Sequence, residues 1–357
     1  MADKIIQLEK GVAYHGNRFL THIKEDMRDI ASRGFDTVVH MFSHNDWDRH
    51  KKIMCEIFDI TKSYGLDVWV DNWGLGGPPG DKSHFLSYHP EAHQVYSDGT
   101  IAPVYVCFNS PAYVQFTKDW IDVVGEAGGN KIFWDEPHLL DEKANGDKPA
   151  RWSCRCATCQ KLFEERYNKP MPLELTPEVM EFRTWSIANY FKTVSGYAKS
   201  HGMYNSICVM LGASGISLEN MADICGCDSL DNIGSDPYWC GNPELKGGYA
   251  DVYKHVYEKA KMNLDVCKHF GKEHNLWVQG YMHPRGKDEE VIAATDAIYD
   301  AGARRIFVWG YRGCEGNDYR AECPDRLWGT VDQAFQRITE RWRNEQREAV
   351  RAEMNLK

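Results

Sequence analysis

The regular alternation of short β-rich runs with longer amphipathic runs constrains this chain most. Eight candidate strands can be counted, at residues 11–15, 37–41, 67–71, 131–135, 206–211, 232–236, 276–281 and 305–309. Between them lie segments with apolar residues at three-to-four spacing, which predicts helices at residues 22–33, 51–64, 113–125, 177–200, 252–270, 289–301 and 326–343. Several of these end at a glycine (Gly34, Gly65, Gly202 and Gly302), as helices commonly do. A strand after each such glycine is the βα repeat of a parallel sheet.

Eight βα units favour a closed (β/α)8 TIM barrel over an open doubly wound sheet. A dinucleotide-binding sheet needs a glycine-rich loop after its first strand, and residues 14–17 do not form one. A barrel takes roughly 250 residues without insertions, so we expect residues 1–357 to form one domain. Two long loops, at about residues 74–110 and 137–172, follow the third and fourth strands on the face where barrel enzymes build their sites.

The composition narrows the class of partner. A net charge of −10 argues against nucleic acid, because phosphate binding needs clustered Lys and Arg. No apolar run approaches the roughly 20 residues of a membrane span, and residues 1–11 lack the apolar core of a signal peptide, so we expect a cytoplasmic protein without a membrane partner. The 12 Trp and 18 Tyr suit carbohydrate, since their flat apolar faces stack on sugar rings.

The carboxyl ends of seven predicted strands carry polar and aromatic side chains, which share one mouth if the barrel closes. This pattern predicts a polar cleft with aromatic walls and a carbohydrate substrate. The predicted substrate-binding residues are His15, His40, His44, Asn45, Asp46, Trp73, Trp134, His138, Tyr238, Gln279, Tyr281, His283, Trp309, Tyr311 and Arg312. The fifth strand adds little beyond Cys208 and Met210.

Four carboxylates belong to the same set: Asp71, Asp135, Glu136 and Asp236. Glycoside cleavage needs two, one to protonate the leaving oxygen and one to attack or to activate water. Adjacent Asp135 and Glu136 point to opposite sides of an ideal strand, so we expect only one to face the lumen. We predict Glu136 as the general acid, kept protonated by a neighbouring carboxylate or an apolar wall such as Trp134. Asp135 is then either a second catalytic group or a buried partner.

At these residues the sequence resembles clan A glycoside hydrolases, and most closely the family forty-two β-galactosidases. Asp135-Glu136-Pro137 occupies the place of the clan's strand-four Asn-Glu pair, with Asp replacing Asn. The runs at 89–91, 97–99 and 107–113 look like the family's segment before its third helix. Asp236-Pro237-Tyr238 resembles its strand-six motif, and Trp309 the Trp that floors the sugar site. The resemblance is good from about residue 65 to 172, and it implies a homo-oligomer as one arrangement.

A cysteine motif completes the resemblance. Cys154, Cys156 and Cys159 offer three thiolates, whereas tetrahedral zinc takes four ligands. In the family the fourth comes from a Cys ahead of the third helix, which maps to Cys107. The resemblance therefore implies a structural Zn²⁺ on Cys107, Cys154, Cys156 and Cys159 that tethers the two long loops; the alternative is a cluster of free thiols. No organic cofactor is expected.

One departure from the family affects the mechanism. Retaining enzymes of the clan need a Glu nucleophile at the end of strand seven, and residues 278–284 contain none; Gln279 is not a nucleophile. Asp236 and Asp71 are the candidate partners of Glu136. A base acting through water fits an inverting mechanism, with carboxyls roughly 6.5–9.5 Å apart rather than roughly 5–5.5 Å.

Three functions remain open from the sequence. The first is a glycoside hydrolase, with exo action on a small glycoside or short oligosaccharide because the long loops narrow the cleft. The second is a sugar isomerase, epimerase or lyase, for which His15, His40, His44, Asp46 and His283 supply bases or metal ligands. The third is a sugar-binding barrel that has lost its nucleophile and does not catalyse a reaction.

Overall fold

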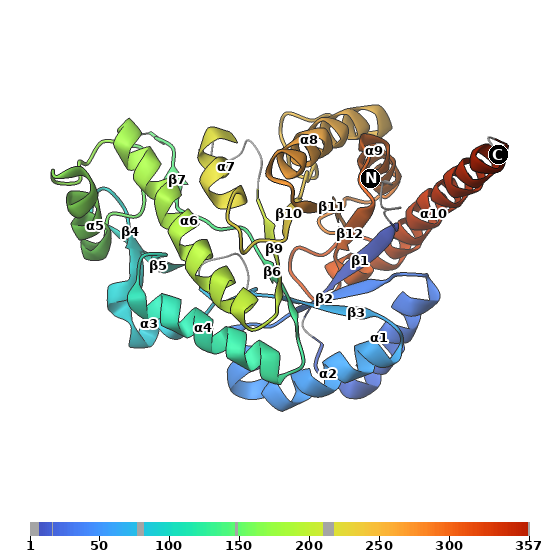
Figure 1. Cartoon of the computed structure of the whole chain (residues 1–357), viewed down its shortest axis with the longest axis horizontal. Helices are drawn as coiled ribbons and strands as arrows, with labels where there is room; N and C mark the ends of the chain where they lie inside the picture. The colour runs from blue at the N-terminus through green and yellow to red at the C-terminus, as the bar shows by residue number, and fades with distance from the viewer. Residues whose placement is uncertain (1–6, 16, 77–81, 147–148, 210–217, 356–357) are drawn as a thin grey trace.

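A computed structural model describes residues 7–15, 17–76, 82–146, 149–209 and 218–355. Eight parallel strands close into one barrel in the order β1-β12-β11-β10-β9-β6-β3-β2, which confirms the predicted fold class (Figure 1). The strands are β1 (Glu9–Tyr14), β2 (Thr37–Met41), β3 (Asp67–Asp71), β6 (Lys131–Trp134), β9 (Tyr204–Cys208), β10 (Asn232–Ser235), β11 (Glu273–Gln279) and β12 (Arg305–Trp309). The first and last strands pair in register, with Val12 opposite Val308. Residues 210 and 211, predicted for the fifth strand, lie outside the described residues.

Side chains alternate across the barrel wall, because successive residues of a strand point to opposite faces. The inward residues form one buried cluster that includes Ala13, Val39, Trp69, Phe133, Cys208, Trp277, Phe307 and Trp309. Their outward neighbours, such as Val12, Val38, Val70 and Val278, pack in a second cluster with the helices. Strands buried on both faces explain why the predicted runs are apolar almost throughout.

All seven predicted helices are present with shifted ends: α1 (Leu20–Ser32), α2 (Lys51–Ser63), α4 (Pro111–Glu126), α6 (Pro177–Ser200), α8 (Tyr249–Phe270), α9 (Glu290–Ala301) and α10 (Pro324–Asn355). The Ser110 and Thr176 side chains cap α4 and α6, each followed by a proline in the first turn. Helix α7 (Leu218–Cys225) was not predicted, because it is short and follows the glycine-containing segment 212–215. Helix α10 runs twelve residues past its predicted end at 343.

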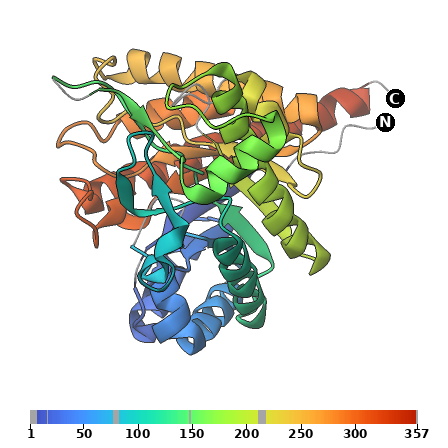
Figure 2. The same cartoon turned by 90° about the vertical axis from the view of Figure 1, so that its left-hand side faces the viewer.

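The two long loops contain secondary structure of their own. After β3 come α3 (Phe85–Tyr88), the short helix η2 (Pro90–Ala92) and a hairpin of β4 (His93–Val95) and β5 (Ile101–Val106). After β6 come a hairpin of β7 (Asp141–Glu142) and β8 (Arg151–Trp152), and then α5 (Ala157–Tyr167). A bridge between Tyr96 and Ser153 joins the two insertions. Figure 1 shows the insertions gathered at the left-hand end of the molecule and α10 extending from the right-hand end, and Figure 2 looks onto the end that carries the insertions.

Among the described helices, none combines the length and the low polarity that crossing a bilayer requires.

Candidate active site

A cavity of about 330 Å³ opens where the barrel strands end. Its lining comes from the ends of β3, β6, β9, β10, β11 and β12 and from the loops that follow them. The lining residues are Trp73, Phe133, Asp135, Glu136, Cys208, Asp236, Tyr238, Trp277, Tyr281, Met282, Trp309 and Tyr319. Seven of them were predicted from the sequence, including three of the four carboxylates.

Aromatic rings form the walls of this cavity. The ring centroid of Trp309 lies 5.4 Å from the ring centroid of Trp73 and 5.2 Å from that of Trp277. Across the cavity Tyr238 and Tyr281 meet edge to face at 5.2 Å. Flat apolar faces with phenol and indole edges around them suit a ring that is apolar on its faces and polar on its rim.

Glu136 and Asp236 form the acidic centre of the cavity. One oxygen of each carboxyl lies within 4.8 Å of the other and of the Cys208 sulfur. Burial, followed by the negative charge of Glu136, raises the pKa of Asp236 well above its usual range. Burial also acts to raise the pKa of Glu136, but hydrogen bonds from His138 and Asp236 outweigh it and bring that pKa below its ordinary value. The opposite directions of these two pKa shifts favour the proton on Asp236 and the negative charge on Glu136.

Two expectations about this pair change as a result. We predicted a protonated Glu136, whereas the pKa directions favour the proton on Asp236, because His138 Nε2 lies 2.8 Å from Glu136 Oε2 and stabilises the anion. We also expected a gap wide enough for a water molecule. One oxygen of each carboxyl lies within 4.8 Å of the other, which is closer than the roughly 6.5–9.5 Å that an inverting pair needs for its water.

Asp135 and Glu136 both line the cavity, so the expected alternation does not hold at this point. The reason is that β6 ends at Trp134, and the chain beyond it is no longer an ideal strand. The Asn72 side chain accepts a hydrogen bond from the Asp135 backbone N–H at 2.9 Å and fixes this bend. Burial and the charge of Glu136 raise the pKa of Asp135 to about 7.

Asp71 does not reach the cavity. It is fully buried on the inward face of β3, two residues after Trp69, and its pKa is raised well above the usual range by burial and by Asp135. A backbone hydrogen bond from Trp73 offsets only part of this effect. A buried neutral carboxyl outside the cavity is a poor partner for Glu136, so Asp236 alone of the two candidates is in place.

Two predicted substrate-binding residues belong instead to the helix-facing core. His40 points outward from β2, where its Nε2 lies 2.9 Å from Thr61 Oγ1 on α2. Trp134 points outward from β6 and donates from its indole N–H to Asn205 at 3.0 Å. In both strands the residue one position away faces inward, and alternation places these two on the other side.

The loop after β2 stays away from the cavity. Asp46 accepts two hydrogen bonds from Arg18, at 2.7 Å each, and Asn45 is exposed at the start of the short helix η1 (Asp46–His50). His44 is buried against His84 and Ser83. These residues shape the loop and were predicted as ligands only because they follow a strand end.

The polar side chains at the end of β11 and just after it hydrogen-bond to backbone groups of the protein. The side-chain amide oxygen of Gln279 (Oε1) accepts hydrogen bonds from the backbone N–H groups of Trp239 and Cys240, both at 2.8 Å. His283 lies 2.9 Å from the backbone oxygen of Gln279 and is buried beside the Trp239 ring. Gln279 therefore holds the loop that follows Asp236, and neither side chain lines the cavity.

His15, Tyr311 and Arg312 line a second cavity of about 520 Å³, beside η3 (Tyr311–Cys314). Tyr311 donates to Asp26 at 3.1 Å, and Arg312 pairs with Glu315 at 3.3 Å. The His15 ring separates the two cavities, because it contacts Trp73 and Trp309 edge to face at 5.4 and 5.1 Å. His138 contacts the main cavity only through Glu136.

Sequence reasoning missed Phe133, Trp277, Met282 and Tyr319 as cavity residues. The first two are inward strand residues one layer below the mouth, and counting alternate positions back from Asp135 and Gln279 would have found them. Met282 and Tyr319 lie on loops, where no periodic signal exists. A hydrogen bond from the Met282 N–H to the Tyr319 backbone oxygen, at 2.9 Å, brings those loops together.

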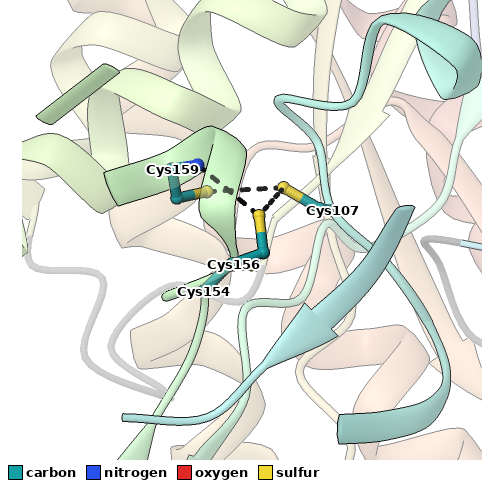
Figure 3. Close-up of side chains that lie close together, drawn as sticks. All are labelled: Cys107, Cys154, Cys156 and Cys159. Carbon is teal, nitrogen blue, oxygen red and sulfur yellow. Dashed lines mark hydrogen bonds between the residues drawn. The ribbon is translucent and has the colours of Figure 1, made fainter. Parts of the chain in front are cut away.

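The four predicted cysteines converge on one buried point (Figure 3). Sγ of Cys107 lies 3.4 Å from that of Cys159 and 3.6 Å from that of Cys156, and all four sulfurs lie within 4.8 Å of one another. Four thiolates at about 2.3 Å from a tetrahedral zinc ion are about 3.8 Å apart, so the spacing fits. Asn109 donates to the Cys159 sulfur at 3.3 Å, the kind of contact that supports a thiolate ligand.

Comparisons with known proteins show the fold and no family. No protein-family model matches the chain, and no curated protein matches it. Among solved structures, the β-amylase catalytic domain from Paenibacillus polymyxa matches with a TM-score of 0.61 at 7% identity, over 85% of this chain and 92% of that one. An endo-1,4-β-mannanase from Rhizomucor miehei matches with a TM-score of 0.60 at 12% identity, over 95% of this chain and 97% of that one. An L-ribulose 3-epimerase matches with a TM-score of 0.52 at 13% identity, over 97% of this chain and 98% of that one. The barrel is thus shared with glycoside hydrolases and a sugar epimerase, and the likeness to family forty-two rests on the sequence motifs alone.

Proposed function

We propose that this chain is a glycoside hydrolase in which Asp236 and Glu136 carry the reaction. The observation that carries the proposal is the carboxyl pair itself: two acids with oxygens within 4.8 Å of each other and with pKa values shifted in opposite directions, inside an aromatic-walled cavity. Glycoside cleavage needs one group in each protonation state. The fold shared with a β-amylase and a mannanase is compatible with this chemistry.

In the proposed reaction Asp236 gives its proton to the departing glycosidic oxygen. The Glu136 carboxylate, held by His138, forms a bond to the anomeric carbon as that oxygen leaves. Water then attacks the same carbon, Asp236 takes up a proton from it, and the bond to Glu136 breaks. The short separation of the two acids favours this retaining route over attack by a water held between them.

The proposed substrate is an uncharged sugar. Three carboxyls line the cavity, and its described lining contains neither Lys nor Arg to balance a phosphate or a uronate. An anionic sugar would bring a further negative charge into a buried acidic site at a large electrostatic cost. The modest volume fits one sugar ring in the cavity and supports exo action on a small glycoside or short oligosaccharide.

Alkyl glycosides and short oligosaccharides of neutral sugars, whose leaving oxygens must be protonated as they depart, test the proposal. Asp236→Asn and Glu136→Gln should each lower kcat/KM by at least about 10³-fold, because each removes a group that acts in the transition state. The thermal midpoint should stay within a few degrees. Met282→Leu, a cavity residue with no acid–base role, is the matched control. NMR of the first-formed product should show retained anomeric configuration; inversion would contradict the assigned pair, and full activity in both variants would contradict the function.

A sugar epimerase is the second candidate, and one observation favours it. Glu136, Cys208 and Asp236 together offer three ligand atoms that a divalent cation would accept. Activity on free ketoses that depends on added Mn²⁺ or Co²⁺ and is lost in Cys208→Ala would support epimerisation. Hydrolysis that persists in EDTA would support the first candidate.

We further propose that Cys107, Cys154, Cys156 and Cys159 hold a structural zinc ion. The spacing of their sulfurs and their full burial support it, as does the Asn109 contact. When bound, zinc would supply a crosslink between the segment after β5 and the segment before α5. Metal analysis of purified protein should find about one zinc per chain; no zinc, with four freely titrating thiols, would contradict this proposal.

A further inference from the structure

A second cluster of metal-ligating side chains lies at the mouth of the barrel, outside the cavity. It consists of His44, which follows β2, Asp48 in η1, and His84, which directly precedes α3. One ligand atom from each lies within 4.8 Å of the other two. None of the three lines the cavity or contacts the cysteine cluster.

The geometry points to a binding site for a transition-metal ion of the zinc, cobalt or nickel type on His44, Asp48 and His84. His84 Nε2 lies 2.8 Å from Asp48 Oδ2, and His44 Nε2 lies 3.9 Å from Asp48 Oδ1. Neighbouring ligands of a tetrahedral ion with bonds of about 2.1 Å are about 3.4 Å apart, which falls between these two separations. The three ligand atoms therefore lie within the span of one coordination sphere.

The orientation of His44 supports this assignment. Its Nδ1 lies 2.8 Å from Ser83 Oγ, which leaves Nε2 directed at Asp48. A hydrogen bond to one ring nitrogen that fixes the other toward the ion is the usual arrangement around metal-bound histidines. The ring is also held edge to face by Phe116 at 4.7 Å, so His44 is in place before an ion arrives.

The other two ligands remain open to solvent. The His84 and Asp48 side chains are 42% and 41% exposed, whereas that of His44 is 10% exposed. A hydrated ion can reach such a site and complete its coordination with water. Two imidazoles and one carboxylate suit zinc, cobalt, nickel or copper better than magnesium or calcium, which favour all-oxygen sites.

The ion would crosslink the loops that follow β2 and β3. The His44 and His84 rings, one from each loop, stack at 3.7 Å with 16° between their planes. The loop after β3 starts with Trp73, a wall of the sugar cavity. Occupancy of the site should therefore stabilise that loop, and this holds whether or not the proposed hydrolase activity is correct.

Cobalt titration of the full chain tests the site. The protein is first loaded with one equivalent of Zn²⁺, which the four thiolates take up in preference to imidazole and carboxylate ligands, and then titrated with CoCl₂ by calorimetry and visible absorption. We expect one further equivalent, without the intense thiolate-to-cobalt band that binding to the cysteines would produce. His84→Ala and Asp48→Asn should each weaken the affinity for this further equivalent of Co²⁺ at least about tenfold. Both residues are exposed, so the variants should fold, which their metal-free thermal midpoints check.

Two control variants make the result specific. His89→Ala removes a similarly exposed histidine that pairs only with Glu91, and it should bind cobalt like the wild type. Cys208→Ala removes a ligand of the cavity group and should also leave the further equivalent unchanged. Absence of a further equivalent in the wild type would overturn the inference, and so would binding that survives His84→Ala or disappears in Cys208→Ala.

Discussion

At the scale of single residues, the environment sets the roles of four chemically similar acids. Asp71 is buried without access to the cavity, and Asp236 is buried against a neighbouring anion, so the pKa of each is well raised. Glu136 is the exception because it has a hydrogen bond from His138. The proposed division into one proton donor and one carboxylate therefore depends on His138, two positions along the chain from Glu136.

Replacing His138 with Ala should move the acid limb of kcat/KM to higher pH. Catalysis in the proposed mechanism needs ionised Glu136, and loss of the His138 hydrogen bond raises the pKa of that carboxyl. Activity should fall most at acidic pH, and at neutral pH by less than about tenfold. The pH profile measures this. His201→Ala, which removes an exposed histidine bonded within its own helical turn, should leave the profile unchanged; an unmoved acid limb in His138→Ala would count against the assigned role.

Asp71→Asn should stabilise the fold, and more so at high pH. The pKa of Asp71 is higher in the folded than in the unfolded chain. The contribution of this carboxyl to the free energy of unfolding is therefore fully present below its unfolded-state pKa, and it is lost as the pH rises through its folded-state pKa. An amide avoids that loss. We expect a gain on the order of 1–3 kcal/mol at pH 8 and little change at pH 4. Thermal unfolding at both pH values tests it, and equal shifts at both would show that ionisation is not the cause.

The placement of a side chain at the cavity was predictable from the sequence where that side chain sits on the inward face at a strand end. Asp236, Tyr238, Tyr281 and Trp309 line the cavity as expected. Prediction failed for His40 and Trp134, because proximity to a strand end does not say which face a residue occupies. It failed for Gln279 because an inward amide was already satisfied by backbone donors from a neighbouring loop, a long-range contact that sequence periodicity does not report.

At the scale of elements, the eight strands were predictable because strands buried on both faces are apolar throughout, and because glycine ends the helices before them. Helix α9, for example, ends at Gly302 with a φ of 110°, which favours glycine. The hairpins in the two insertions were not predicted, since they are only two to six residues per strand. The cysteine motif marked their junction more clearly than any periodicity.

Removal of metal from the cysteine cluster should loosen these insertions before the barrel. Chelation by EDTA, with release of metal followed by a zinc-binding dye, should lower the thermal midpoint by about 5–10 °C. This corresponds to a few kcal/mol in the free energy of unfolding. Cys156→Ser should reproduce the loss, because one of four ligands is gone, whereas Cys55→Ser on α2 should keep both metal and stability. Proteolysis should then cut first between residues 82 and 170; first cleavage within the barrel strands would contradict this order.

At the scale of the whole molecule, the long helix α10 joins two different environments. Its first half packs on the barrel through Trp328 and Phe335, whose rings lie 5.4 and 5.1 Å from that of Phe35. Residues 347–354 are all exposed, and the helix projects away from the barrel (Figure 1). The amphipathic pattern predicted only the packed half, because only burial imposes a hydrophobic periodicity.

A chain ending at residue 346 should therefore unfold within about 2 °C of the full-length protein, because the deleted turns bury almost nothing. Phe335→Ala is the contrasting variant, and it should cost about 3–5 kcal/mol, since it leaves a cavity between α10 and the barrel. Thermal unfolding compares the two. Light scattering of the shortened chain adds a second reading, because exposed Val350 and Met354 lie one turn apart at the end of the helix. We expect an unchanged molar mass per assembly; a fall to a smaller species would instead identify the projecting helix as the contact between subunits of the homo-oligomer that the family resemblance implies.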